Sequence, residues 1–505
     1  MLRYGVIRRG GALAGWQSDC LHRLDRSGIA QMICTATPDR AERLRDLELD
    51  FCLLFGDRED GVALSGVAKY GVWYFACSDV RRFESDTPGF WEIYYRHDVT
   101  AAMLLKIAPG DYAGIVLKEA RLPVSRDCAE NAEALHWALS RFPLNVCSDI
   151  HNGVARYFAD APVPRARQRY GTPSRSQMLS VKLRAAADRF IRNVGHELYR
   201  EDWSVARLAA MPGDYIGLDA RAQLEHVWPH AEGKYQADPW IVAHDGKRYV
   251  FCEEFDYAAY RGRLAVCELP WRGGPPQAAI EEPFHLSYPQ VFRHGDDMFC
   301  VPESAQAGAV RLYRAVGFPN RWEYVRTLIA NFNAIDSTLV RFNGKWWLFC
   351  TGGEGPHSGF NSHLYIWFAD DLFGEWRQHA GNPVKIDVRS SRPAGPFFSH
   401  QNQLYRPAQD CSRSYGGAIS LNRIDTLTET EFGETVAGVI RPPAGRYNEG
   451  IHTITWADGE CIVDVKRHAF YPRGLLAIVK GAVKNAALKA GVPPSVVETM
   501  KKRYR

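Results

Sequence analysis

The chain has 505 residues, of which 46% are hydrophobic and 24% charged, and its formal net charge is +4. This length predicts two or three domains with ample surface to bury. A net charge this small for the length gives no sign of a nucleic-acid partner, and no stretch approaches the 18 apolar residues of a membrane-spanning helix.

The N-terminal residues and the cysteines bear on the cellular compartment. The opening MLRYGVIRRGGALAGW lacks the long apolar core of a secretory signal. The twelve cysteines form no CxxC pair, and most stand in apolar, strand-like runs. We interpret them as small buried residues, expect no metal site, and predict a cytoplasmic location.

Strand-like and helix-like segments alternate through residues 1–150. RYGVIRR and IAQMICTAT predict strands, and LAGWQSDCLHRLDRSG between them predicts a helix. This alternation indicates an α/β domain with a parallel sheet. No GxGxxG or P-loop pattern is present, so no motif supports a bound dinucleotide or ATP.

Residues 69–117 carry the most specific motifs of this domain. They contain PGFWEI, and Asp111 with Gly114 approximates an Asp-x-Gly turn. With these motifs the segment resembles the formyltransferase domain that uses a folate formyl donor, in the version found with sugar-modifying proteins. The resemblance covers residues 1–150 and implies a formyltransferase-like fold.

One departure from that family bears on activity. The family's histidine, which helps to activate the attacking amine, falls at Ala76, and its asparagine falls at Tyr74. Alanine has no proton to exchange and no charge to offer, so we expect no formyltransferase activity. We interpret the domain as a binding or docking module, and His97, in its RHD context, as a solvated surface histidine.

Residues 151–230 indicate a connection between domains. APVPRARQRYGTPSRSQ (161–177) predicts a linker, and QMLSVKLRAAADRFIRNVGHELYRE predicts an amphipathic helix. We expect this helix to pack two domains together, with contact to a membrane surface as the alternative. WSVARLAAM (203–211) predicts a strand that closes a ring of blades next to the last one.

A single phrase recurs five times in the second half of the chain. Each copy has a turn with Gly or Asn, then aromatic and apolar residues, then an acidic or polar residue, as in DGKRYVFCEE and NGKWWLFCTGGE. The turn residues are Gly246, Gly295, Gly344, Asn402 and Gly459. Their spacing is typical of one four-stranded blade, so residues 231–468 predict an all-β five-bladed β-propeller.

The blades bring polar residues to one end of a central funnel. The innermost strands open at Asp238, Tyr288, Asp336, Arg392 and His452. The second strands return to the same rim and end near Glu254, Glu303, Glu354 and Asp410. Glycosidic chemistry needs one carboxylate as base or nucleophile and a second carboxyl as acid, and crowded carboxylates raise each other's pKa.

Two sets of site residues follow. The candidate catalytic residues are Asp238, Asp336, Glu303, Glu254 and Glu354. The candidate substrate-binding residues are Tyr288, Arg392, Arg406, Asp410, His452 and Trp240. For each acidic residue a structural role remains open, since Asp at a strand start often caps a turn.

Several motifs of residues 230–468 resemble one family. HLSYPQVF, VPES, DSTLVRFNGKWWLF and LYRPAQDCSRSYG are similar to the propeller-like domain that precedes the transferase domain of plant glucosamine inositolphosphorylceramide transferases. The second domain of those transferases, with its nucleotide-sugar motif, has no counterpart in this chain.

A more distant resemblance is to the five-bladed glycosidases of the arabinanase and xylosidase clan. That resemblance implies Asp238 as base and Asp336 as the aspartate that tunes pKa values. The acid falls on either Glu354 or Glu303.

The C-terminal residues 469–505 form a basic tail. Apolar residues alternate with lysines in LLAIVKGAVKNAALKAG, and the chain ends in KKRYR. This pattern predicts a basic amphipathic helix that docks on the N-terminal domain, with contact to an anionic membrane surface as the alternative.

Together these patterns predict a cytoplasmic carbohydrate-active enzyme of cell-envelope glycan or glycolipid biosynthesis. We expect glycosyl transfer at the funnel, with a sugar, nucleotide-sugar or lipid-linked glycan as substrate and no cofactor. A five-bladed glycoside hydrolase and a non-catalytic sugar-binding scaffold are the alternatives. The oligomeric state does not follow from the sequence.

Overall fold

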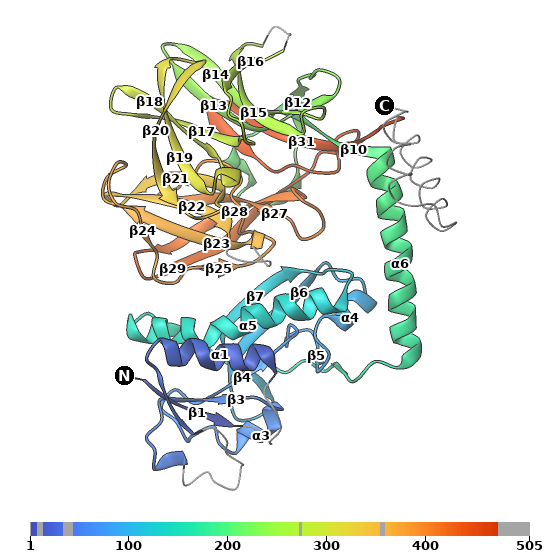
Figure 1. Ribbon diagram of the computed structural model, residues 1–505, viewed down its shortest axis with the longest axis vertical. Helices are drawn as coiled ribbons and strands as arrows, with labels where there is room; N and C mark the ends of the chain where they lie inside the picture. The colour runs from blue at the N-terminus through green and yellow to red at the C-terminus, as the bar shows by residue number, and fades with distance from the viewer. Residues whose placement is uncertain (1, 8–13, 34–43, 272–274, 354–358, 473–505) are drawn as a thin grey trace, which may run out of the picture.

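The computed structural model describes residues 2–7, 14–33, 44–271, 275–353 and 359–472. An α/β domain and a ring of β-sheets lie one above the other, and the long helix α6 (Arg175–Leu198) runs from the first to the second (Figure 1). Within the described residues no helix is both long and apolar enough to span a lipid bilayer.

The α/β domain is built on a seven-stranded mixed sheet in the order β2-β1-β3-β4-β6-β7-β8. Its strands are β1 (Arg3–Ile7), β2 (Ala30–Ile33), β3 (Phe51–Leu54), β4 (Val72–Ala76), β6 (Val99–Lys106), β7 (Tyr112–Pro123) and β8 (Val163–Pro164). The first four strands of that order are parallel, as the alternation predicts. The pairs β4–β6, β6–β7 and β7–β8 are antiparallel, and the short turn between β6 and β7 makes those two strands a hairpin.

Apolar side chains cover both faces of this sheet. The helices are α1 (Gly15–Arg26), α3 (Arg58–Val62), α4 (Phe90–Tyr94) and α5 (Cys128–His151). On one face Phe51 and Trp73 stack at 4.1 Å between ring centres, in a core that includes Leu135 and Leu139 of α5. The sheet is therefore buried on both sides, which agrees with its apolar strands.

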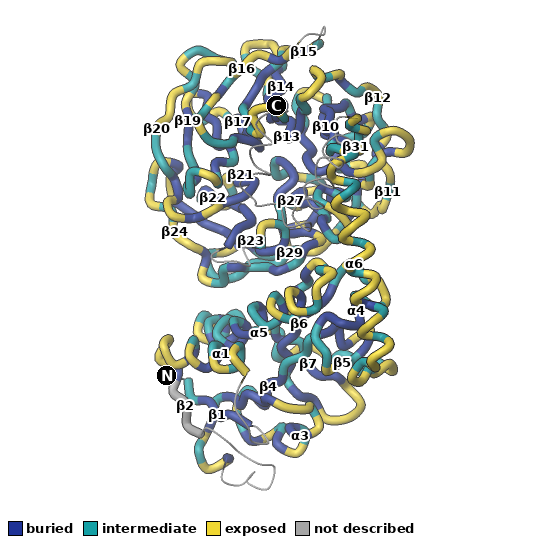
Figure 2. The backbone as a smooth tube through the Cα atoms, turned by 45° about the vertical axis from the view of Figure 1, so that its right-hand side comes forward, coloured by how far each residue is buried: buried dark blue, intermediate teal, exposed yellow. Residues whose placement is uncertain are grey.

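Helix α6 begins at a complete capping box, in which Ser174 and Gln177 satisfy each other's backbone N–H groups. Of its side chains only Val181 is buried, although several apolar ones follow helical spacing. Leu183 and Phe190 are 63% and 70% exposed, and Figure 2 shows most of the helix as exposed. The prediction that this apolar stripe packs two domains together is therefore wrong.

Five antiparallel sheets form the propeller. Blade 1 contains β13 (Lys234–His244), β14 (Lys247–Asp256), β15 (Arg261–Leu269) and β16 (Gln277–Ile280). Blade 2 contains β17 (Ser287–His294), β18 (Asp297–Glu303), β19 (Ala309–Gly317) and β20 (Arg321–Ala330). The third is β21 (Ile335–Phe342), β22 (Lys345–Gly352), β23 (Gly359–Ala369), β24 (Arg377–Gln378), to which β25 (Lys385–Ile386) adds. The fourth is β26 (Phe398–His400), β27 (Gln403–Asp410), β28 (Ala418–Leu427), β29 (Phe432–Arg441), with β11 (Asp219–Arg221) at its edge.

The fifth blade joins the two ends of the propeller sequence. Its strands lie in the order β30 (Ile454–Ala457), β31 (Glu460–Phe470), β10 (Tyr199–Leu208) and β12 (Leu224–Val227). Strand β10 pairs with β31 along its whole length. The prediction of a ring-closing strand at 203–211 is confirmed. This pairing ties the strand that follows α6 to the last blade, so the ring has no open edge there.

The two domains touch where β7 and α5 of the first meet the region around β23 and β25 of the propeller. The Val388 N–H donates to the Arg121 carbonyl at 2.9 Å, and Trp137 of α5 meets the His363 ring at 4.7 Å between centres. Ile386 of β25 lies in the core of the α/β domain. The interface is thus partly apolar and partly a backbone contact.

Candidate functional site

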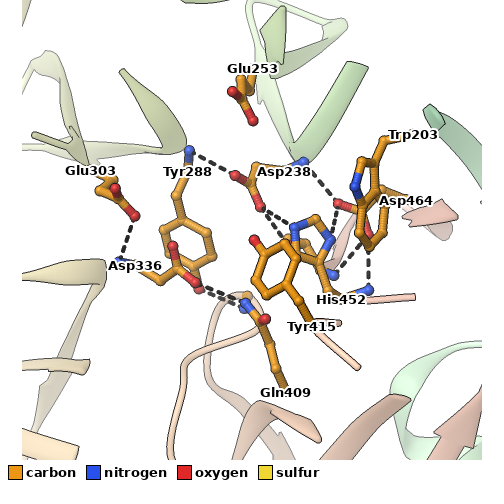
Figure 3. Close-up of polar contacts among 12 residues, drawn as sticks. Trp203, Asp238, Glu253, Tyr288, Glu303, Asp336, Gln409, Tyr415, His452 and Asp464 are labelled. Atoms are coloured by element: carbon orange, nitrogen blue, oxygen red, sulfur yellow. Dashed lines mark hydrogen bonds and ion pairs between the residues drawn. The ribbon is translucent and has the colours of Figure 1, made fainter. Parts of the chain in front are cut away.

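The innermost strands of blades 1, 2 and 3 share one irregularity. Each pairing with the second strand breaks at the same place, and there Asp238, Tyr288 and Asp336 have φ values of 51°, 47° and 51°. A non-glycine residue in this region costs about 1–2 kcal/mol. Such strain gathers at functional sites, and here it turns three equivalent side chains toward the centre of the ring (Figure 3).

Asp238 lies in a cluster with His452 and Asp464, and all three are buried. The Asp238 carboxylate accepts from Thr453 Oγ1 at 2.9 Å and lies 3.3 Å from His452 Nε2. Asp464 accepts from the backbone N–H groups of Asp238 and Thr453. Asp464 thereby fixes blade 1 to blade 5.

The second ring nitrogen of His452 faces the other carboxylate. His452 Nδ1 lies 2.6 Å from Asp464 Oδ2 without hydrogen-bond geometry, so this contact is an ion pair. Burial disfavours the charged ring, but the carboxylates of Asp464 and Asp238 outweigh it and raise the pKa of His452. Trp203 covers the ring at 4.0 Å between centres.

Asp238, His452 and Asp464 are also candidate metal ligands, although the sequence led us to expect no metal site. Their ligand atoms all lie within 4.8 Å of one another, a spacing that suits a metal ion. Both nitrogens of His452 already face carboxylate oxygens, however, which suits a protonated ring rather than a ligand to a cation.

Asp336 is held by a different set of donors. Arg392 reaches it with Nε at 2.6 Å and Nη2 at 3.3 Å, and Gln409 Nε2 donates to it at 2.8 Å. The backbone N–H of Asp336 donates to Glu303 Oε2 at 3.4 Å. Arg392 also donates to the Tyr415 hydroxyl. Arg392 and Tyr415 belong to blade 4, so the contact of Arg392 with Asp336 joins blade 4 to blade 3.

Tyr288 fills the space between these two groups (Figure 3). It is fully buried; its hydroxyl accepts from the Gly395 N–H at 2.6 Å and lies 2.8 Å from Thr338 Oγ1. Glu303, Arg392 and Tyr415 are only partly buried. These three residues are therefore the more accessible members of the cluster.

Glu253 is a funnel residue that the sequence reasoning missed. It is buried, its Oε1 makes no hydrogen bond within the described residues, and it lies 3.4 Å from His285 Nε2. Strand alternation sends only one of two adjacent residues toward the funnel. The EE pair of DGKRYVFCEE was the available signal, but it does not say which of the two faces inward.

Five carboxyl groups share this funnel with few cations. Burial, followed by the charge of Asp238, raises the pKa of Glu253, and burial with Asp336 raises that of Glu303. Burial raises the pKa of Asp238 to about 6 although His452 opposes it. The funnel thus gathers carboxyls whose pKa values are raised by burial and by one another's charge, the kind of environment in which acid–base groups are found.

Three residues that were predicted to line the funnel lie outside it, because their side chains are used in the packing and ion pairs of the blades. Glu254 is ion-paired with Lys234 and Arg263. Trp240 is buried, and its indole donates to the Val291 carbonyl. The prediction that they line the funnel is wrong for both.

Arg406 is the third. It is buried against Glu434 at 2.6 Å and donates to the carbonyls of Ser390 and Ser391. All three of its guanidinium nitrogens thereby donate within blade 4, so the prediction that it binds substrate in the funnel is wrong as well.

Asp410 falls outside the funnel, and Glu354 cannot be placed. Asp410 accepts from the Ser412 N–H and faces a cleft between the domains rather than the funnel. Glu354 lies outside the described residues, and so does most of the basic tail at 469–505.

The α/β domain places its predicted motifs at the end of β4. Ala76 ends that strand and lines a cavity of about 270 Å³ together with Arg58 and Arg165. Asp111 is exposed in the turn before β7. His97 is half-buried with Nδ1 unpartnered among the described residues, so its interpretation as a solvated surface histidine is wrong.

Comparison with known proteins supports the propeller resemblance. Residues 227–447 match the family model of the N-terminal part of glucosamine inositolphosphorylceramide transferase 1. Over 205 residues the chain is 33% identical to that transferase from Oryza sativa subsp. japonica and 31% identical to the one from Arabidopsis thaliana. In both cases the match covers 40% of this chain and 27% of the relative.

Similar solved structures include a family 117 glycoside hydrolase from Zobellia galactanivorans, with a TM-score of 0.33 and 13% identity over 51% of this chain and 79% of that one. A protein of Mycobacterium tuberculosis described as a sugar N-formyltransferase has a TM-score of 0.29 and 10% identity over 37% of this chain and 87% of that one. At such scores neither likeness bears on activity. The propeller, over residues 227–447, is thus homologous to the N-terminal part of the glucosamine inositolphosphorylceramide transferases.

Proposed function

We propose that this protein transfers a glycosyl unit in the biosynthesis of a glycolipid or cell-envelope glycan, and that the chemistry takes place at the propeller funnel. The observation that carries the proposal is the set of five carboxyl groups around Tyr288, with raised pKa values at Glu253, Glu303 and Asp238. The names of the plant relatives supply the class of reaction.

The geometry suggests a role for each group. Glu303 is partly exposed, so it is the carboxyl that meets the sugar first. In the transfer step one carboxylate takes the proton of the acceptor hydroxyl while that oxygen bonds to the anomeric carbon, and the bond to the leaving group breaks. We assign Glu303 and Asp238 to proton exchange, and Asp336 to positioning through Arg392.

A glycoside hydrolase would use the same groups with water as acceptor. The raised pKa of Glu303 favours this alternative, because a protonated carboxyl is the general acid that a leaving sugar needs. A non-catalytic sugar-binding scaffold is favoured instead by burial, since Asp238, Asp336 and Asp464 all have protein donors.

Activity assays separate these three functions. The full chain is incubated with nucleotide sugars and an inositolphosphorylceramide acceptor, and separately with oligosaccharides, and products are identified by mass spectrometry. Glycolipid product supports transfer, and shortened oligosaccharide supports hydrolysis. The matched variants are Asp336→Asn and Asp245→Asn, the second being an exposed turn residue on blade 1. Wild-type turnover in Asp336→Asn contradicts the funnel assignment.

We further propose that the protein works at the cytoplasmic surface of a membrane. The exposed apolar stripe of α6 includes Leu183 and Phe190, and basic residues such as Arg184 and Arg189 lie between them. Helices of this composition bind anionic lipid surfaces. The described chain ends next to α6, because the Tyr471 N–H donates to the Leu198 carbonyl, so the basic tail begins there.

Sedimentation with phosphatidylglycerol vesicles tests this location. We expect the wild-type chain to co-sediment and Leu183→Ser/Phe190→Ser to remain in solution. Tyr260→Ser removes an 80% exposed aromatic side chain from blade 1 and serves as the control. Equal sedimentation of all three proteins contradicts the proposed membrane contact.

A further inference from the structure

A cleft of about 440 Å³ lies between the α/β domain and the propeller, outside the funnel. One wall comes from the residues around α4 and the start of β6, and the other from blade 4 and the segment before it. Its lining includes six arginines, namely Arg82, Arg96, Arg121, Arg389, Arg413 and Arg441. The volume is that of a small-molecule site.

The positive charge of this cleft is only partly neutralised. Four acidic residues face it, but Asp79 is paired with Arg121, and Asp98 is paired with Arg413 across the domain boundary at 3.1 Å. Arg82 and Arg96 make no side-chain hydrogen bond or ion pair with any described residue. Two guanidinium groups are thus left available on the α/β wall.

Buried polar atoms without partners lie in the same wall. Glu92 is buried and its Oε1 accepts from Thr100 Oγ1 at 2.9 Å, while its Oε2 has no partner among the described residues. His97 Nδ1 is also unpartnered. Burial raises the pKa of Glu92, which lessens its repulsion of an anion.

Arg96, on the wall of the cleft, has a left-handed backbone conformation. Arg96 follows the end of α4 with φ 57°, a position that glycine normally takes. The His97 N–H donates back to the Glu92 carbonyl at 2.8 Å, which closes the helix end. An arginine there costs free energy that a glycine would not, and it places a cation on the cleft wall.

We propose that this cleft binds the phosphate group of a small anionic ligand between the two domains. Planar guanidinium groups donate in pairs to phosphate oxygens. Arg82 and Arg96 supply such groups from one wall, and the other wall adds Arg389 and Arg413, which are ion-paired with Asp387 and Asp98 and keep further N–H donors. A sugar phosphate and a nucleoside diphosphate share this chemistry. The proposal does not depend on activity in the funnel.

The cleft and the funnel share one loop. Residues 411–417 present Ser412 and Arg413 to the cleft and Tyr415 to the funnel, where the Tyr415 carbonyl accepts from Lys466 Nζ at 2.7 Å. A ligand that holds Arg413 therefore acts on a loop whose opposite side contacts the funnel cluster.

Isothermal titration of the full chain with inorganic phosphate, glucose 1-phosphate and uridine diphosphate at physiological salt tests the proposal. We expect saturable binding of at least one probe, and the tightest probe tells a sugar phosphate from a nucleotide. Arg82→Gln and Arg413→Gln, one from each domain, should each weaken binding about tenfold or more, because each removes a charge-assisted pair of hydrogen bonds. Arg341→Gln removes an exposed arginine outside the cleft and should bind as the wild type does.

Two results overturn the proposal. One is the absence of saturable binding of all three probes to the folded wild-type chain. The other is a loss confined to the arginine of one domain, which would place the ligand on that domain alone. Neither result bears on glycosyl transfer, which is measured separately with Asp336→Asn.

Discussion

The end of β4 and the propeller funnel are both places where strands deliver side chains to one point, yet they differ in chemistry. The formyltransferase family that the α/β domain resembles has a histidine at the end of this strand, whereas this chain has Ala76 there. In the funnel, blades 1, 2, 3 and 5 deliver five carboxyl groups and His452. The end of β4 lacks the histidine on which that chemistry depends, whereas the funnel gathers buried carboxyls with raised pKa values, so fold alone does not assign activity.

The comparison also separates two kinds of buried charge. Arg406 and Glu434 neutralise each other inside blade 4, and all three guanidinium nitrogens of Arg406 donate there. Glu253 and Glu303 lie in the funnel without a matching cation of their own, and their pKa values rise. Unmatched charge, rather than buried charge as such, distinguishes a reactive site from a structural pair.

The largest effect is expected from the funnel acids. Glu303→Gln keeps the size of the side chain but removes the proton it exchanges, so turnover should fall by about 10²–10⁴-fold. Steady-state rates measure this loss. The exposed Asp245→Asn should retain full activity, and circular dichroism checks that both variants fold. Full activity of Glu303→Gln with glycolipid product would move the acid role to Glu253.

Arg406→Ala tests the structural pair. Removing one partner leaves Glu434 buried with Lys385 as its remaining cation, which should lower the free energy of unfolding by about 3–5 kcal/mol. Urea denaturation measures the change. Arg423→Ala breaks an exposed pair with Asp425 and should cost about 0–1 kcal/mol. Equal costs would contradict the distinction between buried and exposed pairs.

Tyr288→Phe probes the centre of the funnel. The change removes the hydroxyl that accepts from the Gly395 N–H and leaves that buried group unsatisfied, which should cost about 1–3 kcal/mol. Thermal unfolding detects the loss. Tyr260→Phe, at an exposed position, should leave the midpoint unchanged. A neutral Tyr288→Phe would mean that water replaces the hydroxyl.

Stability should depend on pH through Asp238. Its pKa of about 6 in the folded protein lies above its ordinary value of 3.8, so the folded state binds the proton more tightly than the unfolded chain. This contribution is fully present below about pH 4 and is lost as the pH rises through about 6. Urea unfolding across this range should show that the free energy of unfolding falls less steeply with pH in Asp238→Asn than in the wild type. An identical slope in both proteins contradicts the raised pKa.

The smallest effect is expected at the end of β4. Because Ala76 offers neither a proton nor a charge, titration with a folate formyl donor should release no formyl group to an amino sugar. Asp111→Asn should leave every measured activity unchanged, since Asp111 is exposed in a turn. Formyl transfer by the wild-type chain would show that another residue replaces the histidine.

The sequence by itself determined the architecture of the propeller. The recurring turn phrase sets a blade period, and the strand at 203–211 predicts ring closure, which β10 confirms. Local patterns suffice here because each blade repeats the same turn chemistry and alternation. The family likeness over residues 227–447 likewise rests on motifs that the sequence displays.

Only the tertiary structure decided which polar residues meet. Asp238, Asp336 and Glu303 were assigned to the funnel from their places in the repeat, and they lie there, but Glu254 and Arg406 pair within their blades while Glu253 faces inward. A bulge in the innermost strands of blades 1, 2 and 3 redirects one side chain in each, and on β14 no local pattern specifies which of Glu253 and Glu254 faces inward. The arginine cleft joins residues more than 300 positions apart, such as Asp98 and Arg413, so it exists only when the two domains meet.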